Sequence, residues 1–193
     1  MKASKRTGKG AIAGLVLIST LGVLAARAEE SGASYAKVME VLPQSKLTLA
    51  QGIQQATAKA PEAAISAKFE IHEGHLALSV YTAEKGLNGD AEHNVLKELI
   101  GSPTESKWTP EVEVFKDVPH VSRSAQQLAL MSLTKVSLLD VIKKAEQDEG
   151  LKVFSVTPTI RDGKPVFVLL AAAPGKAREV QYDLMTGEKA RGR

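Results

Sequence analysis

The sequence contains two copies of one pattern, and this repeat limits the possible folds more than any other feature. A constant offset of 89 positions aligns residues 36–82 with residues 125–171 without a gap. Eight of the aligned pairs are identical, among them Leu49/Leu138 and Gly74/Gly163, and they fall on expected helix starts, helix faces and turns. Self-similarity at a fixed offset is typical of a duplicated structural unit, so a fold built from two similar units is predicted.

Each copy contains an amphipathic segment that follows a hydroxyl residue. Thr48 and Ser137 occupy equivalent positions directly before these segments, and both are predicted to cap the N-terminus of a helix. Gln51 can complete a capping box with Thr48. Asp140 suits the positive end of the helix dipole. The second helix is expected to end near Gly150.

Two extended segments follow each helix and are separated by a short turn. Glu73-Gly74 divides the segments of the first copy, and Asp162-Gly163 divides those of the second, which predicts a β-hairpin in each. Residues 179–184 alternate apolar and polar side chains and predict a further strand with one buried face. Residues 91–100 fit either a strand or a short helix, and the repeat favours the strand.

These elements predict an α+β protein made of two units, each with helices packed on a three-stranded antiparallel sheet. The expected boundaries are residues 29–101 for the first unit, 102–120 for a connector and 121–193 for the second unit. Three prolines mark the connector, and Trp108 is expected to anchor it.

Residues 1–28 have the features of a secretory signal peptide. Positive charges without acids precede an apolar stretch over residues 11–26, which is shorter than the roughly 20 residues that span a bilayer. Ala26 and Ala28 supply the small residues that a signal peptidase recognises, so the mature chain is expected to begin at Glu29. We therefore expect a periplasmic or secreted protein without a permanent membrane span; an uncleaved membrane tether is the alternative.

Charge and cysteine content exclude several classes of function. The formal net charge of +3 becomes −2 once the five positive charges of residues 1–28 are removed. The mature chain has no net positive field for a phosphate backbone, so nucleic acid is not expected as a partner. The chain has no cysteine, which excludes disulfides, thiolate catalysis and cysteine metal sites.

Two segments of the second copy resemble the PepSY domain, a family found in propeptides of thermolysin-type metallopeptidases and in many exported bacterial proteins. Residues 137–145 are similar to the opening helix of the family, and residues 180–188 resemble its closing strand and its Asp-x-x-Thr-Gly-Glu turn. Asp183, Thr186 and Gly187 match that turn, where their expected role is structural. The end of the first copy, residues 99–103, lacks the turn pattern.

The resemblance implies a non-enzymatic protein that binds and restrains or regulates an envelope peptidase, with no catalytic residues and no cofactor. The alternative is a periplasmic carrier or sensor for a small ligand or a metal, and a third class is a structural protein of the envelope. His72 and His75 could meet across a hairpin and bind a metal weakly, but their spacing differs from the helical His-Glu-x-x-His motif. We therefore expect them to be exposed hairpin residues and name no metal site. The usual catalytic signatures are also absent from the mature sequence.

Overall fold

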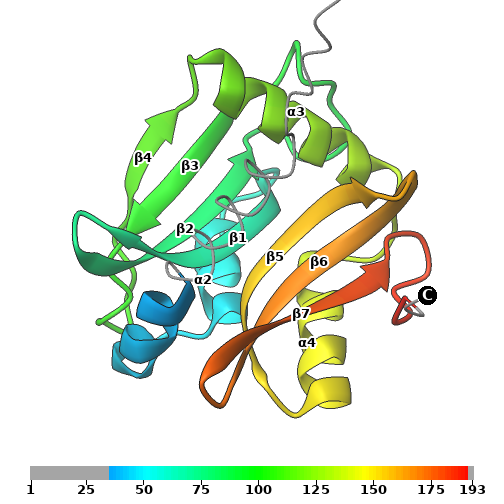
Figure 1. Cartoon of the computed structure of the whole chain (residues 1–193). Helices are drawn as coiled ribbons and strands as arrows, with labels where there is room; N and C mark the ends of the chain where they lie inside the picture. Colours follow the sequence, from blue (N-terminus) through cyan, green and yellow to red (C-terminus); the bar gives the residue numbers. More distant parts are fainter. Residues whose placement is uncertain (1–34, 191–193) are drawn as a thin grey trace, which may run out of the picture.

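The computed structural model describes residues 35–190 and centres on one antiparallel sheet of seven strands (Figure 1). The strand order across the sheet is β4-β3-β2-β1-β5-β6-β7. The strands are β1 (Ala63–His72), β2 (His75–Ala83), β3 (Leu96–Gly101), β4 (Glu111–Val114), β5 (Lys152–Arg161), β6 (Lys164–Ala173) and β7 (Lys176–Asp183).

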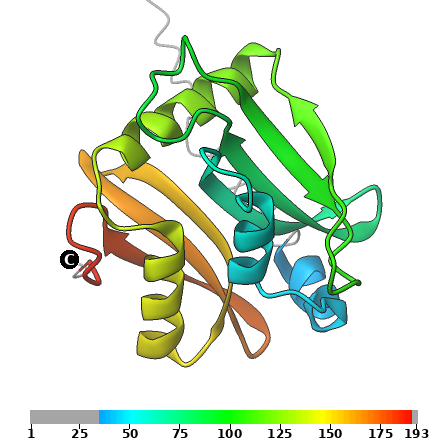
Figure 2. The same cartoon turned by 180° about the vertical axis from the view of Figure 1, so that it is seen from behind.

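Helices lie on the sheet and at its end. Residues 35–41 are helical and lead into a 3₁₀ turn, η1 (Leu42–Gln44). The helices α2 (Leu49–Ala56) and α4 (Leu138–Glu149) lie side by side on one face of the sheet (Figure 2). Helix α3 (Val118–Ser132) crosses one end of the sheet and contacts strands of both halves, β1, β3 and β5.

The α+β class is confirmed, but the expected division into two separate three-stranded sheets is wrong. Strands β1 and β5 pair through Ala67↔Val156 and Lys68↔Ser155, which joins the two halves into one sheet. The first strand of each unit would otherwise be an open edge with unpaired backbone groups, and this pairing covers both edges at once. The buried side chains of the two halves accordingly form one continuous hydrophobic core.

The sequence repeat corresponds to an approximate two-fold relation between the halves. Ala67 and Val156, which pair at the junction, are equivalent positions under the offset of 89. The pairing of β1 with β2 shifts register between Ala64 and Ser66, and that of β5 with β6 shifts between Val153 and Ser155, again at equivalent positions. A β-bulge bends its strand and increases its twist, so the two hairpins are curved alike.

The caps and hairpin turns expected from the sequence are confirmed. Thr48 and Ser137 cap α2 and α4, and both form full capping boxes, with Gln51 and Asp140 as the third residues. Gly150 ends α4 in the left-handed conformation. Both residues of each hairpin turn have positive φ, with values of 49° and 82° at residues 73 and 74 and of 50° and 74° at residues 162 and 163.

The segment expected to be a connector is more structured than its prolines indicated. Residues 102–120 contain β4, which pairs with β3, and also the first residues of α3. Trp108 is 6% exposed, which confirms its expected anchoring role. The segment 91–100 contributes a strand, as the repeat favoured, but β3 begins only at Leu96.

Candidate functional site

An open groove of about 360 Å³ lies on the sheet face opposite α2 and α4. Strands β1 to β4 form its floor, and the first turns of α3 form one wall. Side chains alternate between the two faces of a strand, and the cross-strand register places the groove residues of the four strands on one common face. The charged lining residues are Lys68, Glu70, Glu98, Glu111, Glu113 and Arg123.

Tyr81 forms the buried base of the groove, and its side chain is packed between polar and aromatic neighbours. The ring is 5.5 Å from the ring of Phe115, and the Lys68 ammonium is 5.7 Å from the Tyr81 ring centroid. Burial, followed by the negative charges of Glu98 and Glu70, raises the pKa of Tyr81 above its ordinary value. The Tyr81 hydroxyl therefore stays protonated at neutral pH and can donate a hydrogen bond.

Glu70 is held in a fixed position at the floor of the groove. Its Oε2 lies 2.5 Å from the Lys68 Nζ, and the buried Ser79 hydroxyl donates a short hydrogen bond to its Oε1. One oxygen is thus engaged by Lys68 of the same strand and the other by Ser79 of the neighbouring strand β2. A carboxylate held in this way presents a defined charge rather than a mobile one.

The helical wall of the groove is anchored by Asp117 and His120. The Asp117 side chain caps α3 by accepting from the His120 backbone N–H, and the His120 ring stacks on Phe115 with the ring centroids 5.2 Å apart. The backbone N–H of His120, together with the His120 ring, holds the pKa of Asp117 below its ordinary value. These contacts position the start of α3, whose second turn carries Arg123 at the groove.

The groove carries an excess of negative charge. Four carboxylates line it, against the two permanent cations Lys68 and Arg123. Within residues 35–190, neither Glu98, Glu111, Glu113 nor Arg123 forms an ion pair, so only Lys68 and Glu70 neutralise each other. Glu111, Glu113 and Arg123 are exposed and available to a ligand, whereas Glu98 is buried and adds negative charge from below. The net negative charge favours a positively charged ligand.

A second pocket of about 300 Å³ lies on the helix side of the sheet and is mainly apolar. The apolar walls come from α2, α3, the start of α4, the loop between β2 and β3 and the loop between α3 and α4, through Ile53, Leu87, Met131, Val136 and Leu138. Glu62 adds one carboxylate at the rim.

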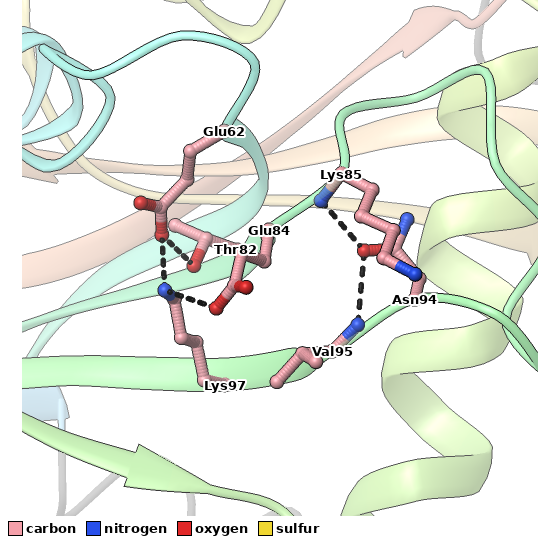
Figure 3. A network of polar contacts seen from close by, with 7 residues as sticks. All are labelled: Glu62, Thr82, Glu84, Lys85, Asn94, Val95 and Lys97. Atoms are coloured by element: carbon pink, nitrogen blue, oxygen red, sulfur yellow. Dashed lines mark hydrogen bonds and ion pairs between the residues drawn. The ribbon is translucent and has the colours of Figure 1, made fainter.

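A polar network fixes the loop that carries Leu87 (Figure 3). The Lys97 Nζ lies 3.2 Å from the Glu62 Oε1 and 3.1 Å from the Glu84 Oε2, and the Thr82 hydroxyl donates to Glu62. Burial lowers the pKa of Lys97, but the hydrogen bonds with Glu84 and Glu62 outweigh it and raise the pKa overall. Asn94 also accepts from the Lys85 backbone N–H, which closes the base of the loop.

The turn that resembles the PepSY pattern is a compact structural element. The Asp183 Oδ1 accepts hydrogen bonds from the backbone N–H groups of Met185 and Thr186 and from the Thr186 hydroxyl. Gly187 has a φ of 70°, and a Cβ there would lie 3.3 Å from both methyl carbons of Val136. The turn lies outside both pockets, and the hydrogen bonds of the Asp183 carboxylate stay within the turn.

The structure describes His72 and His75 but not Ala26 and Ala28. His72 and His75 are cross-strand neighbours at the end of the β1–β2 hairpin, and both are exposed. Among residues 35–190 there is no group of three or more His, Cys, Asp or Glu side chains arranged to hold a metal. Ala26 and Ala28, and with them the expected cleavage site, lie outside the described residues.

Sequence reasoning missed the groove. Its floor requires β4, which has no counterpart in the repeat and lies in a proline-marked segment. The one available signal was the alternation in Glu111-Val112-Glu113-Val114, which is typical of a strand.

Comparison with known protein families, curated proteins and solved structures gave no match to this chain. In the part of the chain that the structure covers, none of the helices has the length and apolar character needed to cross a membrane.

Proposed function

We propose that this protein is an exported, non-enzymatic binding protein that restrains a peptidase of the cell envelope. After removal of residues 1–28 it would work in the periplasm or outside the cell. Its two halves would be PepSY-like units that have merged into one sheet.

The negatively charged groove is the observation that carries this proposal. It is open, it is formed by four strands and a capped helix, and three of its carboxylates have no ion-pair partner within residues 35–190. Such a surface suits a basic segment on another protein, because complementary charges accelerate encounter and favour one partner over others. The assignment of that partner as a peptidase rests on the resemblance of residues 137–145 and 180–188 to the PepSY family.

The repeated geometry supports the two-unit part of the proposal. The bulges, the hairpin turns and the capping boxes occur at equivalent positions of both halves. Each half thus has a capped helix on a curved hairpin with one further strand beside it.

The proposal is tested with immobilised protein that begins at Glu29. Envelope extract is passed over it, the retained fraction is assayed for peptide-bond hydrolysis, and the recovered peptidase is then titrated with free protein. We expect its activity to fall until the two proteins are equimolar. A retained peptidase that keeps full activity at saturation would contradict restraint.

A matched pair of variants links the effect to the groove. Glu111→Gln with Glu113→Gln removes two groove carboxylates from an exposed strand, whereas Glu92→Gln with Glu105→Gln removes two exposed carboxylates elsewhere. We expect the first pair to weaken binding by about tenfold, since charge-assisted contacts contribute roughly 1.4 kcal/mol or more, and the second pair to have little effect.

The apolar pocket favours a second candidate function, the binding of a small ligand. Its volume of about 300 Å³ is at the lower end of the range for small-molecule sites, and its lining is mainly apolar with one carboxylate, Glu62. Native mass spectrometry of the protein purified from the cell envelope distinguishes ligand binding from peptidase restraint. A retained small molecule lost on Leu138→Trp, which fills the pocket, would favour ligand transport over peptidase restraint.

A further inference from the structure

Strand β4 forms one outer edge of the sheet, and its outward side is open. All four of its residues are exposed, and it pairs with β3 alone among the strands formed by residues 35–190. An open edge carries unpaired backbone N–H and C=O groups, which can pair with an extended segment of another chain.

The hydrogen-bond pattern shows which backbone groups face outward. The Phe115 N–H donates to the Leu96 carbonyl at 3.1 Å, and these residues continue the register in which Leu99 pairs with Val112. In an antiparallel pair, residues alternate between facing the partner strand and facing away from it. The backbone groups of Glu111, Glu113 and Phe115 therefore face β3, and those of Val112 and Val114 face outward.

The side chains of β4 alternate in chemistry as well. Glu111 and Glu113 lie on the groove face, whereas Val112 and Val114 pair with Leu99 and Lys97 on the other face. Val112 is 58% and Val114 45% exposed, and Val112 also borders the groove. Two more valines, Val118 and Val121, are exposed in the first turns of α3. The segment 112–121 thus exposes four valines on and directly after the edge strand.

The opposite edge of the sheet, β7, differs from β4 in its backbone pairing and its charge. Residues 188–190 fold back along the C-terminal end of β7: the Ala190 N–H donates to the Gln181 carbonyl and the Asp183 N–H to the Glu188 carbonyl. The positively charged Arg178 on β7 is paired with Glu149. Of the two edges, β4 is therefore the acidic one, and it is open along all four of its residues.

We propose that a basic, extended segment of the partner protein adds to β4 as an eighth strand. Residues opposite Glu111 and Glu113 would be lysine or arginine, and residues opposite Val112 and Val114 would be apolar, because directly paired residues lie on the same face. This inference rests on the proposed function for the identity of the partner. A second copy of this chain is a poor occupant, because two-fold pairing of β4 with itself brings glutamates of both copies together.

The test uses a blocked octapeptide that alternates lysine with valine or threonine, labelled for fluorescence anisotropy. We expect it to bind the protein, and we expect a matched peptide with glutamate in place of lysine to bind at least tenfold more weakly. N-methylation of the residues that would face Val112 and Val114 should also weaken binding, because it removes backbone donors and leaves the charges in place.

Variants of the protein test the edge directly. Val112→Pro removes an outward N–H that β3 does not use, so the strand should stay paired while peptide affinity falls by about tenfold. Glu111→Lys with Glu113→Lys should reverse the preference in favour of the glutamate peptide. Leu133→Ser is the control. Leu133 is also an exposed apolar residue, 64% exposed, but it lies outside β4, so this variant should bind the peptide as the wild type does.

The outcomes separate the edge from the proposed function. If Val112→Pro and the charge-reversed variant bind the lysine peptide and restrain the peptidase as the wild type does, the edge is not the binding element, although restraint itself stands. If the wild type binds the peptide in the expected order but leaves the captured peptidase fully active, the edge inference stands and peptidase restraint is wrong.

Discussion

At the scale of single residues, Gly187 has the most demanding environment of the residues that match the PepSY turn. Its φ is 70°, and a Cβ would meet Val136 at 3.3 Å, in the region between the turn and α4. Gly187→Val should therefore lower the free energy of unfolding by about 1–3 kcal/mol, whereas Gln181→Thr on the outer face of β7 should change it by less than about 0.5 kcal/mol. The denaturant midpoints of the two variants measure these changes in stability. Unchanged stability with lost partner binding would mean that the turn is a binding element.

Asp183 in the same turn should make stability depend on pH in the acid range. The backbone hydrogen bond from Thr186, together with the Thr186 hydroxyl and the Met185 N–H, holds the pKa of Asp183 below its ordinary value. The folded state thus binds this proton less readily than the unfolded state. The stability that ionised Asp183 contributes is therefore present above pH 3.8, the ordinary value for Asp, and is lost as pH falls through the lower pKa of the folded state.

Asp183→Asn keeps an acceptor oxygen but removes the charge. Between pH 5 and pH 2.5, its unfolding free energy should therefore fall less steeply than that of the wild type, as measured by urea unfolding at about five pH values. Parallel curves for the two proteins would show that Asp183 is not the titrating group.

At the scale of elements, the two hairpin turns offer a matched comparison. Glu73 and Asp162 occupy the same turn position with φ of 49° and 50°, but Asp tolerates positive φ several-fold better than most residues. Glu73→Asn should stabilise the protein by about 0.5–1 kcal/mol, because a several-fold conformational preference corresponds to that free energy. Asp162→Asn is the control and should be nearly neutral. Equal midpoints for Glu73→Asn and the wild type would contradict this account of the first turn.

The elements predicted correctly from the sequence are those with local signals. The capping boxes at Thr48 and Ser137 and the hairpin turns at Gly74 and Gly163 depend on residues within a few positions of each other. The pairing of β1 with β5 has no such signal, because it joins residues 87 and 89 positions apart through backbone groups that any sequence carries. The groove also depends on non-local pairing, since Glu111 and Glu113 join Glu98 only once β4 is paired with β3.

At the scale of the whole molecule, the shared sheet and core imply that the two halves unfold together. Helix α3 contacts strands of both halves, and β1 pairs directly with β5. Differential scanning calorimetry should therefore show one transition whose calorimetric and van't Hoff enthalpies agree. Two resolved transitions would mean that the units fold independently and that the β1–β5 pairing contributes little.

The central claim is that a protein partner occupies the groove and the β4 edge. The most direct test is amide hydrogen exchange of the chain, measured with and without its captured peptidase. Slower exchange is predicted on binding for residues 111–114 and for the first turns of α3, with no change along β7. Backbone groups of Val112 and Val114 would acquire partners, and the wall that carries Arg123 would be covered. Unchanged exchange at β4, with protection confined to α2 and α4 around the apolar pocket, would contradict the account.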